Sequence, residues 1–334
     1  MPHPHDTPHP GGATADLVAE TPPATTPGTA PGTAVGTATT PGTATAPGTA
    51  VGAPVSISVA APAYNEADNI TTAITRWHTY LDRHPAVGAW EIVVCDDGST
   101  DTTRALLTDL QHRCPHLVII GFDRNRGAGA AIAAAIAATR HDWIVLLDSD
   151  GQFPITNLDR FLPHLQTGTA TAFSGARLHK ADTLPYRWGS AASGAVSNLL
   201  HRTRYRDFNS IFKVVRGPLL RALPLESGGM NCSTEITARL TETGHTWTEI
   251  PIEHHPRGGG RRGWRFWRGA LDRALFVAYL GYRRWLLHRG VLRAPAVPDL
   301  TDPTATLHPT GTARTAPSGT TAAHDLSGTA REAR

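Results

Sequence analysis

The sequence lacks the features that mark several large classes of protein. Its 334 residues include only three cysteines, which are odd in number and far apart, so no disulfide framework is expected and a reducing compartment is favoured. No cysteine pair has the spacing of a structural zinc site. No run of about 20 apolar residues indicates a transmembrane helix. Residues 1–30 also lack the basic start and apolar stretch of a secretory signal.

Large apolar side chains are nearly absent from both ends of the chain. Residues 1–54 and 293–334 are rich in Thr, Ala, Pro and Gly, and the first stretch repeats Pro-Gly-Thr-Ala four times. Such segments bury too little surface to offset the entropy lost on ordering, so both are predicted to be disordered tails. Residues 55–292 remain, which is enough for a large domain with a hydrophobic core.

Within residues 55–147, short apolar runs alternate with segments of helical periodicity. Strands are predicted at 55–61, 90–95, 117–122 and 143–147, and helices at 66–83, 101–112 and 127–139. Asn65 is the expected N-cap of the first helix. Alternation at this spacing predicts an α/β fold with a Rossmann-like, mostly parallel sheet flanked by helices.

Three of the predicted strands end in polar loops: Tyr64-Asn65-Glu66, Asp96-Asp97-Gly98-Ser99 and Asp148-Ser149-Asp150. Because the carboxyl ends of parallel strands meet at one edge of a sheet, we expect a ligand site there. Asp148 and Asp150 can both reach one hard cation such as Mg²⁺ or Mn²⁺. The alternative is a polar turn that caps the next element.

A glycine-rich turn, Asn125-Arg126-Gly127-Ala128-Gly129, precedes the alanine-rich helix. A turn of this kind at a helix N-terminus can bind an anion, or it can simply start the helix. It is not a phosphate-binding loop of the Walker type, because no Gly-Lys-Ser/Thr follows it.

Four motifs in this order resemble those of family 2 glycosyltransferases with the GT-A fold: Pro62-Ala63-Tyr64-Asn65-Glu66, Asp96-Asp97-Gly98-Ser99-Thr100-Asp101, Asn125-x-Gly127-x-Gly129 and Asp148-x-Asp150-Gly151-Gln152-Phe153-Pro154. Within that family, the pattern is most similar to polyprenyl-phosphate sugar synthases such as the dolichyl-phosphate mannose synthases. The resemblance makes residues 55–268 the glycosyltransferase domain.

The resemblance implies a nucleotide-diphosphate sugar, UDP- or GDP-linked, as donor, a divalent cation and inversion at the anomeric carbon. The residues expected to bind the nucleotide sugar are Pro62, Ala63, Tyr64, Glu66, Asp96, Asp97, Gly127, Asp148, Ser149 and Gln152. Asp148 and Asp150 are the expected metal ligands, with Gln152 beside the metal or the sugar, and Asp150 is counted among the catalytic residues.

The acceptor is expected to be a polyprenyl phosphate. In that case the attacking oxygen is already anionic, and the cations expected to hold it are Arg177, Arg187, Lys213 and Arg257. Arg177 and Lys213 are also candidate catalytic residues. If the acceptor is instead a glycan or other soluble hydroxyl, a base is needed, and Glu235 is the candidate. A third alternative is a basic scaffold that keeps the fold without activity.

The last part of the folded region, 269–292, is predicted to be an amphipathic helix rich in arginine and aromatic residues. The chain has a net charge of +3, and residues 257–289 contain nine arginines against one acid, Asp272. Such a helix suits an anionic membrane surface, although it could also dock on the sheet or attract nucleic acid. We expect peripheral attachment to the cytoplasmic face of a membrane and no nucleic-acid partner.

Overall fold

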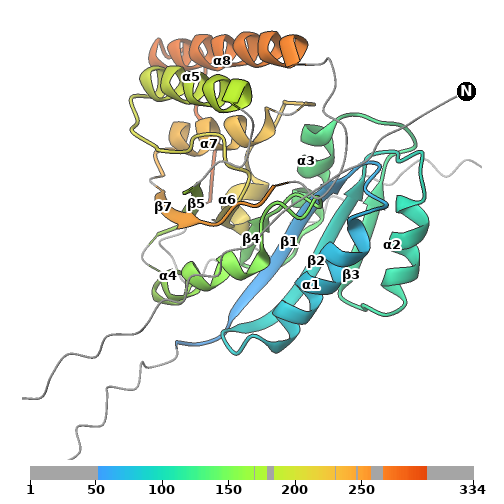
Figure 1. Ribbon diagram of the computed structural model, residues 1–334. Coiled ribbons are helices and arrows are strands. Elements are labelled where there is room, and N and C mark those ends of the chain that lie inside the picture. Colours follow the sequence, from blue (N-terminus) through green and yellow to red (C-terminus); the bar gives the residue numbers. More distant parts are fainter. Residues whose placement is uncertain are drawn as a thin grey trace, which may run out of the picture. The chain divides into compact units, whose positions relative to one another are not determined.

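The computed structural model describes residues 52–168, 170–178, 184–229, 231–245, 247–256 and 266–298 (Figure 1). Most of the two predicted tails therefore lies outside the described residues. The three cysteines are buried and free. No helix in the described part of the chain is long and apolar enough to cross a membrane.

The described residues form one seven-stranded sheet in the order β3-β2-β1-β4-β6-β5-β7. Its strands are β1 Val55–Ala63, β2 Val87–Asp96, β3 Leu117–Gly121, β4 Trp143–Leu146, β5 Ala172–Arg177, β6 Lys213–Arg216 and β7 Thr248–Ile252. Only β6 runs antiparallel to its neighbours, β4 and β5, among these pairings. The prediction of a mostly parallel sheet is confirmed.

Helices cover both faces of this sheet. They are α1 Ile70–Arg83, α2 Thr103–Gln111, α3 Ala128–Ala138, the 3₁₀ helix η1 Ile155–Arg160, α4 Leu162–Thr167, α5 Leu184–His201, α6 Gly217–Arg221, α7 Cys232–Glu242 and α8 Phe266–His288. Helices α1 and α2 pack together beside β2 and β3, α3 packs on β1 and β2 and contacts α6 and α7, and α5 and α8 pack side by side against α7.

Strand β1, the third of the seven in the sheet, is buried on both faces. All five consecutive residues from 57 to 61 are 0% exposed, although their side chains alternate between the two faces. The apolar stripe predicted for the first helix is also buried, at Ile70, Ile74, Trp77 and Leu81. These small and branched side chains form a continuous core beneath the strand ends that carry the polar loops.

The predicted N-cap of the first helix is wrong. Helix α1 begins at Ile70, with Asn69 at the N-cap position. Asn65 instead has a φ of 53°, and its side-chain oxygen accepts a hydrogen bond from the Thr100 N–H at 2.8 Å. An Asn tolerates this left-handed conformation because its short polar side chain can bond locally, so Asn65 links two loops rather than starting the helix.

Candidate active site

The three polar loops meet at the carboxyl edge of neighbouring strands. Ser149, which follows β4, donates from its hydroxyl to the Pro62 carbonyl at 2.9 Å. The Asn65 N–H donates to the Ser99 hydroxyl at 3.0 Å. The first bond joins the loop after β4 to the end of β1, and the second joins the loop after β1 to the loop after β2. The expected convergence of the three loops is therefore confirmed.

Asp97 holds the glycine-rich turn in place. Its two carboxylate oxygens accept the N–H groups of Arg126 and Gly127 at 2.7 and 2.9 Å, and its side chain is buried. Gly127 has a φ of 96°, and a Cβ there would lie 2.0 Å from the Gly228 carbonyl oxygen. The turn therefore requires glycine, and Asp97 shapes the edge of the site through the backbone.

The other nucleotide-binding candidates differ in accessibility. Asp96 is buried and receives hydrogen bonds from the Ser99 N–H and from Arg104. Glu66 is also buried and accepts from the Asn69 amide at 2.8 Å. Tyr64 is 42% exposed, so its ring is the one large aromatic surface that the loop after β1 presents to solvent.

Asp148 and Asp150 supply carboxylate oxygens beyond the end of β4. Asp148 is half-buried and Asp150 is buried, and one Asp150 oxygen accepts the Gln152 N–H at 3.0 Å. The Gln152 amide donates to the His255 carbonyl at 3.3 Å. Within the described ranges, no group of three or more His, Cys, Asp or Glu residues could hold a metal alone. Carboxylate oxygens are ligands that Mg²⁺ and Mn²⁺ prefer, so the two aspartates have the donor chemistry that such an ion needs.

Arg177, at the end of β5, is anchored by Asp207. Its Nε and Nη2 atoms donate to the two Asp207 oxygens at 2.6 and 3.0 Å. Asp207 is itself fixed, because its backbone N–H donates to Glu249 at 2.8 Å. A two-point ion pair of this kind sets the plane of the guanidinium as well as its position.

Lys213 lies inside the protein rather than at its surface. Its side chain is 0% exposed, its ammonium donates to the Ser210 carbonyl, and it lies 5.0 Å from the centre of the Trp247 ring. Burial lowers the pKa of Lys213 to about 7, and the nearby Asp207 carboxylate opposes this shift. Lys213 therefore interacts electrostatically with Asp207 and Arg177 inside the protein, and it does not present a charge to solvent.

Glu235 is likewise fully buried, and its carboxylate already has several partners. Its oxygens accept the backbone N–H of Glu226 at 2.9 and 3.1 Å and that of Ser227 at 2.8 Å. The Arg239 guanidinium donates to the same carboxylate at 3.1 Å. A general base must reach the proton that it removes, and no atom of Glu235 is exposed to an acceptor in this structure.

Cys232 and Arg273 are two further groups of this region to which the sequence patterns assigned no role. Burial raises the pKa of the Cys232 thiol to about 12, with Asp148 adding to the rise and Lys213 opposing it. Burial lowers the pKa of Arg273, and the charge of Arg177 lowers it further. Arg273 on helix α8 therefore lies close enough to Arg177 for the two charges to interact.

Two of the acceptor-site candidates, Arg257 and the side chain of Arg187, lie outside the described residues.

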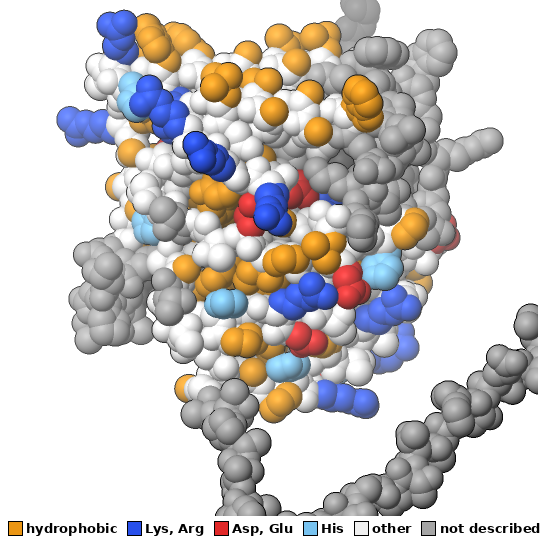
Figure 2. Space-filling model, turned by 60° about the vertical axis from the view of Figure 1, so that its left-hand side comes forward, with side chains coloured by type: hydrophobic (Ala, Val, Ile, Leu, Met, Phe, Trp, Pro, Cys, Tyr) orange, Lys and Arg blue, Asp and Glu red, His pale blue; other side chains and the backbone are white. Residues whose placement is uncertain are grey.

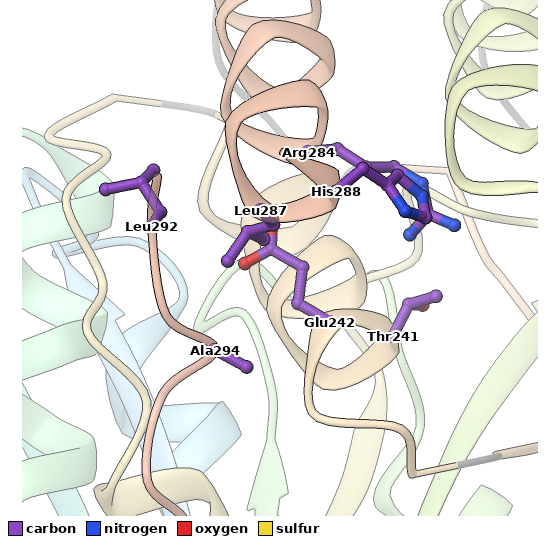
Figure 3. A pocket seen from close by; sticks show the side chains of 7 residues that line it. All are labelled: Thr241, Glu242, Arg284, Leu287, His288, Leu292 and Ala294. Atoms are coloured by element: carbon purple, nitrogen blue, oxygen red, sulfur yellow. The ribbon is translucent and has the colours of Figure 1, made fainter. Parts of the chain in front are cut away.

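A cavity of about 200 Å³ lies between α7 and α8. Figure 3 shows its lining: Thr241, Glu242, Arg284, Leu287, His288, Leu292 and Ala294. None of these residues was predicted to belong to the site.

The outer faces of α5 and α8 carry exposed apolar side chains. Figure 2 shows hydrophobic side chains gathered over these two helices, with basic side chains toward one end. The most exposed members of this apolar face are Trp188, Val196 and Leu199 on α5 and Leu271, Leu275, Tyr282 and Trp285 on α8. The opposite side of α8 docks on the domain, since Val277 and Leu280 are buried.

The chain matches the family model described as glycosyl transferase family 2 over residues 58–224. It is 29% identical over 225 residues to the undecaprenyl-phosphate 4-deoxy-4-formamido-L-arabinose transferase of Salmonella typhimurium. This match covers 65% of each chain, so less than two thirds of the relative's length is represented.

Solved structures with a similar fold include two sugar-phosphoglycerate synthases. The glucosyl-3-phosphoglycerate synthase of Mycobacterium tuberculosis, in complex with Mn²⁺, UDP and phosphoglyceric acid, gives a TM-score of 0.52 at 18% identity, covering 74% of this chain and 80% of that one. The mannosyl-3-phosphoglycerate synthase of Rubrobacter xylanophilus gives 0.51 at 17% identity, covering 75% and 78%. At these identities the likeness shows a shared fold alone.

Proposed function

The chain belongs to glycosyl transferase family 2 and has the GT-A fold, and we propose that it moves a sugar from a nucleotide diphosphate to a polyprenyl phosphate at a membrane surface. Activity as a glycosyltransferase is part of this proposal and is supported by the family match. The lipid acceptor, the donor and the membrane location are proposed as well.

The observation that carries the proposal is the guanidinium of Arg177, which a two-point ion pair fixes at the end of β5. This end of β5 lies at the same edge of the sheet as the acidic end of β4. Asp207 orients Arg177 through two hydrogen bonds, and Arg273 lies within electrostatic reach of it. Oriented guanidinium groups bind phosphate oxygens in two-point contacts. The 29% identical Salmonella protein, whose name gives undecaprenyl phosphate as its acceptor, supports a lipid phosphate.

We place the nucleoside against the loops after β1 and β2. The exposed ring of Tyr64 offers a face on which a base can stack. Pro62 and Ala63 are the last two residues of β1, directly before Tyr64. Glu66 and Asp96 lie at the same carboxyl edge of the sheet. Asp97 holds the Gly127 turn, so we assign it a positioning role in addition to the expected contact with the nucleotide.

The reaction breaks the bond between the anomeric carbon and the diphosphate oxygen. A phosphate oxygen of the lipid forms the new bond at that carbon from the opposite side, so the configuration inverts and the nucleoside diphosphate leaves. Asp148 and Asp150 would hold a Mg²⁺ or Mn²⁺ ion, which would supply positive charge for the departing diphosphate. Arg177 orients the acceptor phosphate, and no base is needed because the attacking oxygen is already anionic.

We propose that the apolar face of α5 and α8 contacts the lipid. Aromatic and aliphatic side chains on amphipathic helices, with arginine at their edges, suit the interface between headgroups and acyl chains. Trp285 is 50% exposed and Arg289 lies 5.2 Å from its ring centre. We place this membrane contact on the cytoplasmic side, because free cysteines are typical of reducing compartments.

Nucleotide binding is the experiment that tests the donor part of this proposal. UDP and GDP are titrated into the full chain with Mn²⁺, with Mg²⁺ and with chelator, and the heat of binding is measured. Metal-dependent binding of one nucleotide is expected, with loss of that binding in Asp148→Asn/Asp150→Asn. If neither nucleotide binds under any condition, the fold is retained without the donor chemistry, and the scaffold alternative replaces the enzyme.

A further inference from the structure

The segment formed by Glu226, Ser227, Gly228 and Gly229, which we term the 226–229 segment, packs directly on the glycine-rich turn. The Gly129 N–H donates to the Gly228 carbonyl at 3.2 Å. A Cβ on Gly129 would lie 1.9 Å from the Ser227 carbonyl oxygen. The two backbones therefore touch, and the Gly-x-Gly spacing is what lets them approach.

Glu235 holds the 226–229 segment from the side of α7. Its carboxylate accepts two backbone N–H groups of that segment, at distances of 2.8 to 3.1 Å. Arg239, whose side chain is 0% exposed, donates to both Glu235 and Glu226. With this arrangement the Glu235 carboxylate fixes the path of the segment.

Helix α8 holds the same region from the other side. The Tyr279 hydroxyl donates to the Glu226 carboxylate at 2.5 Å. About two helical turns earlier, Asp272 accepts from the Asn231 side chain at 2.9 Å. The helix whose outer face we assign to the membrane is therefore linked, through the 226–229 segment, to the turn that Asp97 holds at the donor site.

We propose that Glu235, Tyr279 and Asp272 are positioning residues for the donor site. They fix the 226–229 segment against the Gly127 turn, so that nucleotide binding depends on the docking of α8. The inference rests on the proposed function only in placing the nucleotide beside this turn. It predicts that a small change on α8, outside the nucleotide site, weakens donor binding.

Tyr279→Phe tests the inference, because it removes one hydroxyl and leaves the ring. The matched control is Tyr80→Phe, since the Tyr80 hydroxyl also donates to a carboxylate, that of Asp159, at 2.5 Å, but on α1. We measure UDP and GDP dissociation constants with Mn²⁺ and amide hydrogen exchange in residues 124–131 and 226–229. Tyr279→Phe is expected to weaken nucleotide binding by about threefold to tenfold and to speed exchange in both segments.

Tyr80→Phe is expected to change neither quantity. Faster exchange confined to 226–229, with unchanged nucleotide affinity, overturns the inference, as does the absence of any exchange difference. If the unaltered protein binds neither nucleotide, the proposed function fails separately, and the exchange in 124–131 still decides whether α8 is coupled to the turn.

Glu235→Gln separates positioning from base catalysis. A positioning role predicts weaker nucleotide binding with an unchanged shape of the pH–rate profile. A base predicts unchanged nucleotide affinity, a large fall in kcat and loss of the limb on the acidic side of that profile. Should Glu235→Gln fail to fold, Asp272→Asn takes its place. This change weakens the contact of α8 with Asn231, next to the 226–229 segment, and leaves the buried network of Glu235 and Arg239 intact.

Discussion

The guanidinium of Arg177 faces the carboxylate of Asp207 in a two-point ion pair, with distances of 2.6 Å between Nε and Oδ2 and 3.0 Å between Nη2 and Oδ1. The Arg177 side chain is 11% exposed and that of Asp207 is 2% exposed. A buried pair with this geometry fixes a charge for binding, but it also makes each partner costly to remove alone. Comparing a variant that lacks Arg177 with one that lacks both charges therefore separates the effect of the pair on stability from its effect on activity.

Arg177→Gln is expected to destabilise the protein by about 3–5 kcal/mol, because it leaves the Asp207 carboxylate buried without its main partner. Arg177→Gln/Asp207→Asn removes both charges and is expected to recover much of that loss in thermal unfolding. Transfer to a lipid phosphate is expected to stay low in both variants. Recovery of transfer along with stability in the double variant would show that Arg177 serves the fold alone.

Gly127→Ala is expected to cost more stability than a change at a comparable glycine in open space. Gly244 also has a positive φ, of 77°, but a Cβ there meets nothing within 4 Å. Gly244→Ala therefore measures the backbone strain alone, about 1–3 kcal/mol. Gly127→Ala adds a clash with the Gly228 carbonyl, so its melting temperature is expected to fall further and its nucleotide affinity to drop. Equal melting temperatures in the two variants would argue against the close packing of the turn.

Glu242 is expected to make stability depend on pH. Its carboxylate is buried beside Arg239, Arg283 and Arg284 and lines the cavity with His288. Burial raises its pKa from the ordinary 4.5 to about 7, although Arg239 and Arg284 oppose the shift. Because the folded state holds this proton more tightly than the unfolded state, the contribution is full below the ordinary pKa and is lost as pH rises through about 7.

Glu242→Gln isolates this contribution. Between about pH 5 and pH 8 the free energy of unfolding of the unaltered protein is expected to fall relative to that of the variant, by up to about 3 kcal/mol. Chemical denaturation at a series of pH values measures the difference. Parallel stability curves for the two proteins would mean that Glu242 ionises in the folded state as it does in the unfolded chain.

Leu275→Glu is expected to weaken binding to anionic vesicles about tenfold, since burying a leucine contributes about 1.5–3 kcal/mol. Leu275 is 63% exposed on the apolar face of α8, so the change should leave the fold intact. Thr72→Glu, at an exposed position on α1, adds the same charge away from that face and serves as the control. Vesicle cosedimentation measures both. Equal vesicle binding by the two variants would remove the apolar face from the account.

Much of the fold could be predicted because apolar periodicity reports burial directly. The alternation within residues 55–147 predicted four strands and three helices, and the structure has all seven. The position of Asn65 could not be predicted in the same way. Its positive φ arises from a bond to Thr100 in a loop that is distant in sequence.

Some residues of the candidate site could likewise be found from the local sequence pattern, whereas others are defined only by contacts in the folded chain. The strand-end aspartates were visible because each follows an apolar run. The partners of Glu235 were not, since they are backbone N–H groups that reach it only when the chain folds back from α6 to α7. Arg273 could not be singled out either, because nothing in a run of many arginines indicates which of them lies close to Arg177.

Lipid-dependent sugar transfer is the measurement that tests the central claim most directly. The full chain is incubated with UDP- and GDP-sugars, Mn²⁺ or Mg²⁺, and vesicles with or without polyprenyl phosphate, and the labelled lipid product is counted. We predict turnover that requires the lipid phosphate, stops in chelator and falls at least about 100-fold in Asp148→Asn/Asp150→Asn. Turnover that proceeds equally on a soluble acceptor without lipid, or that persists in this double variant, would contradict the account.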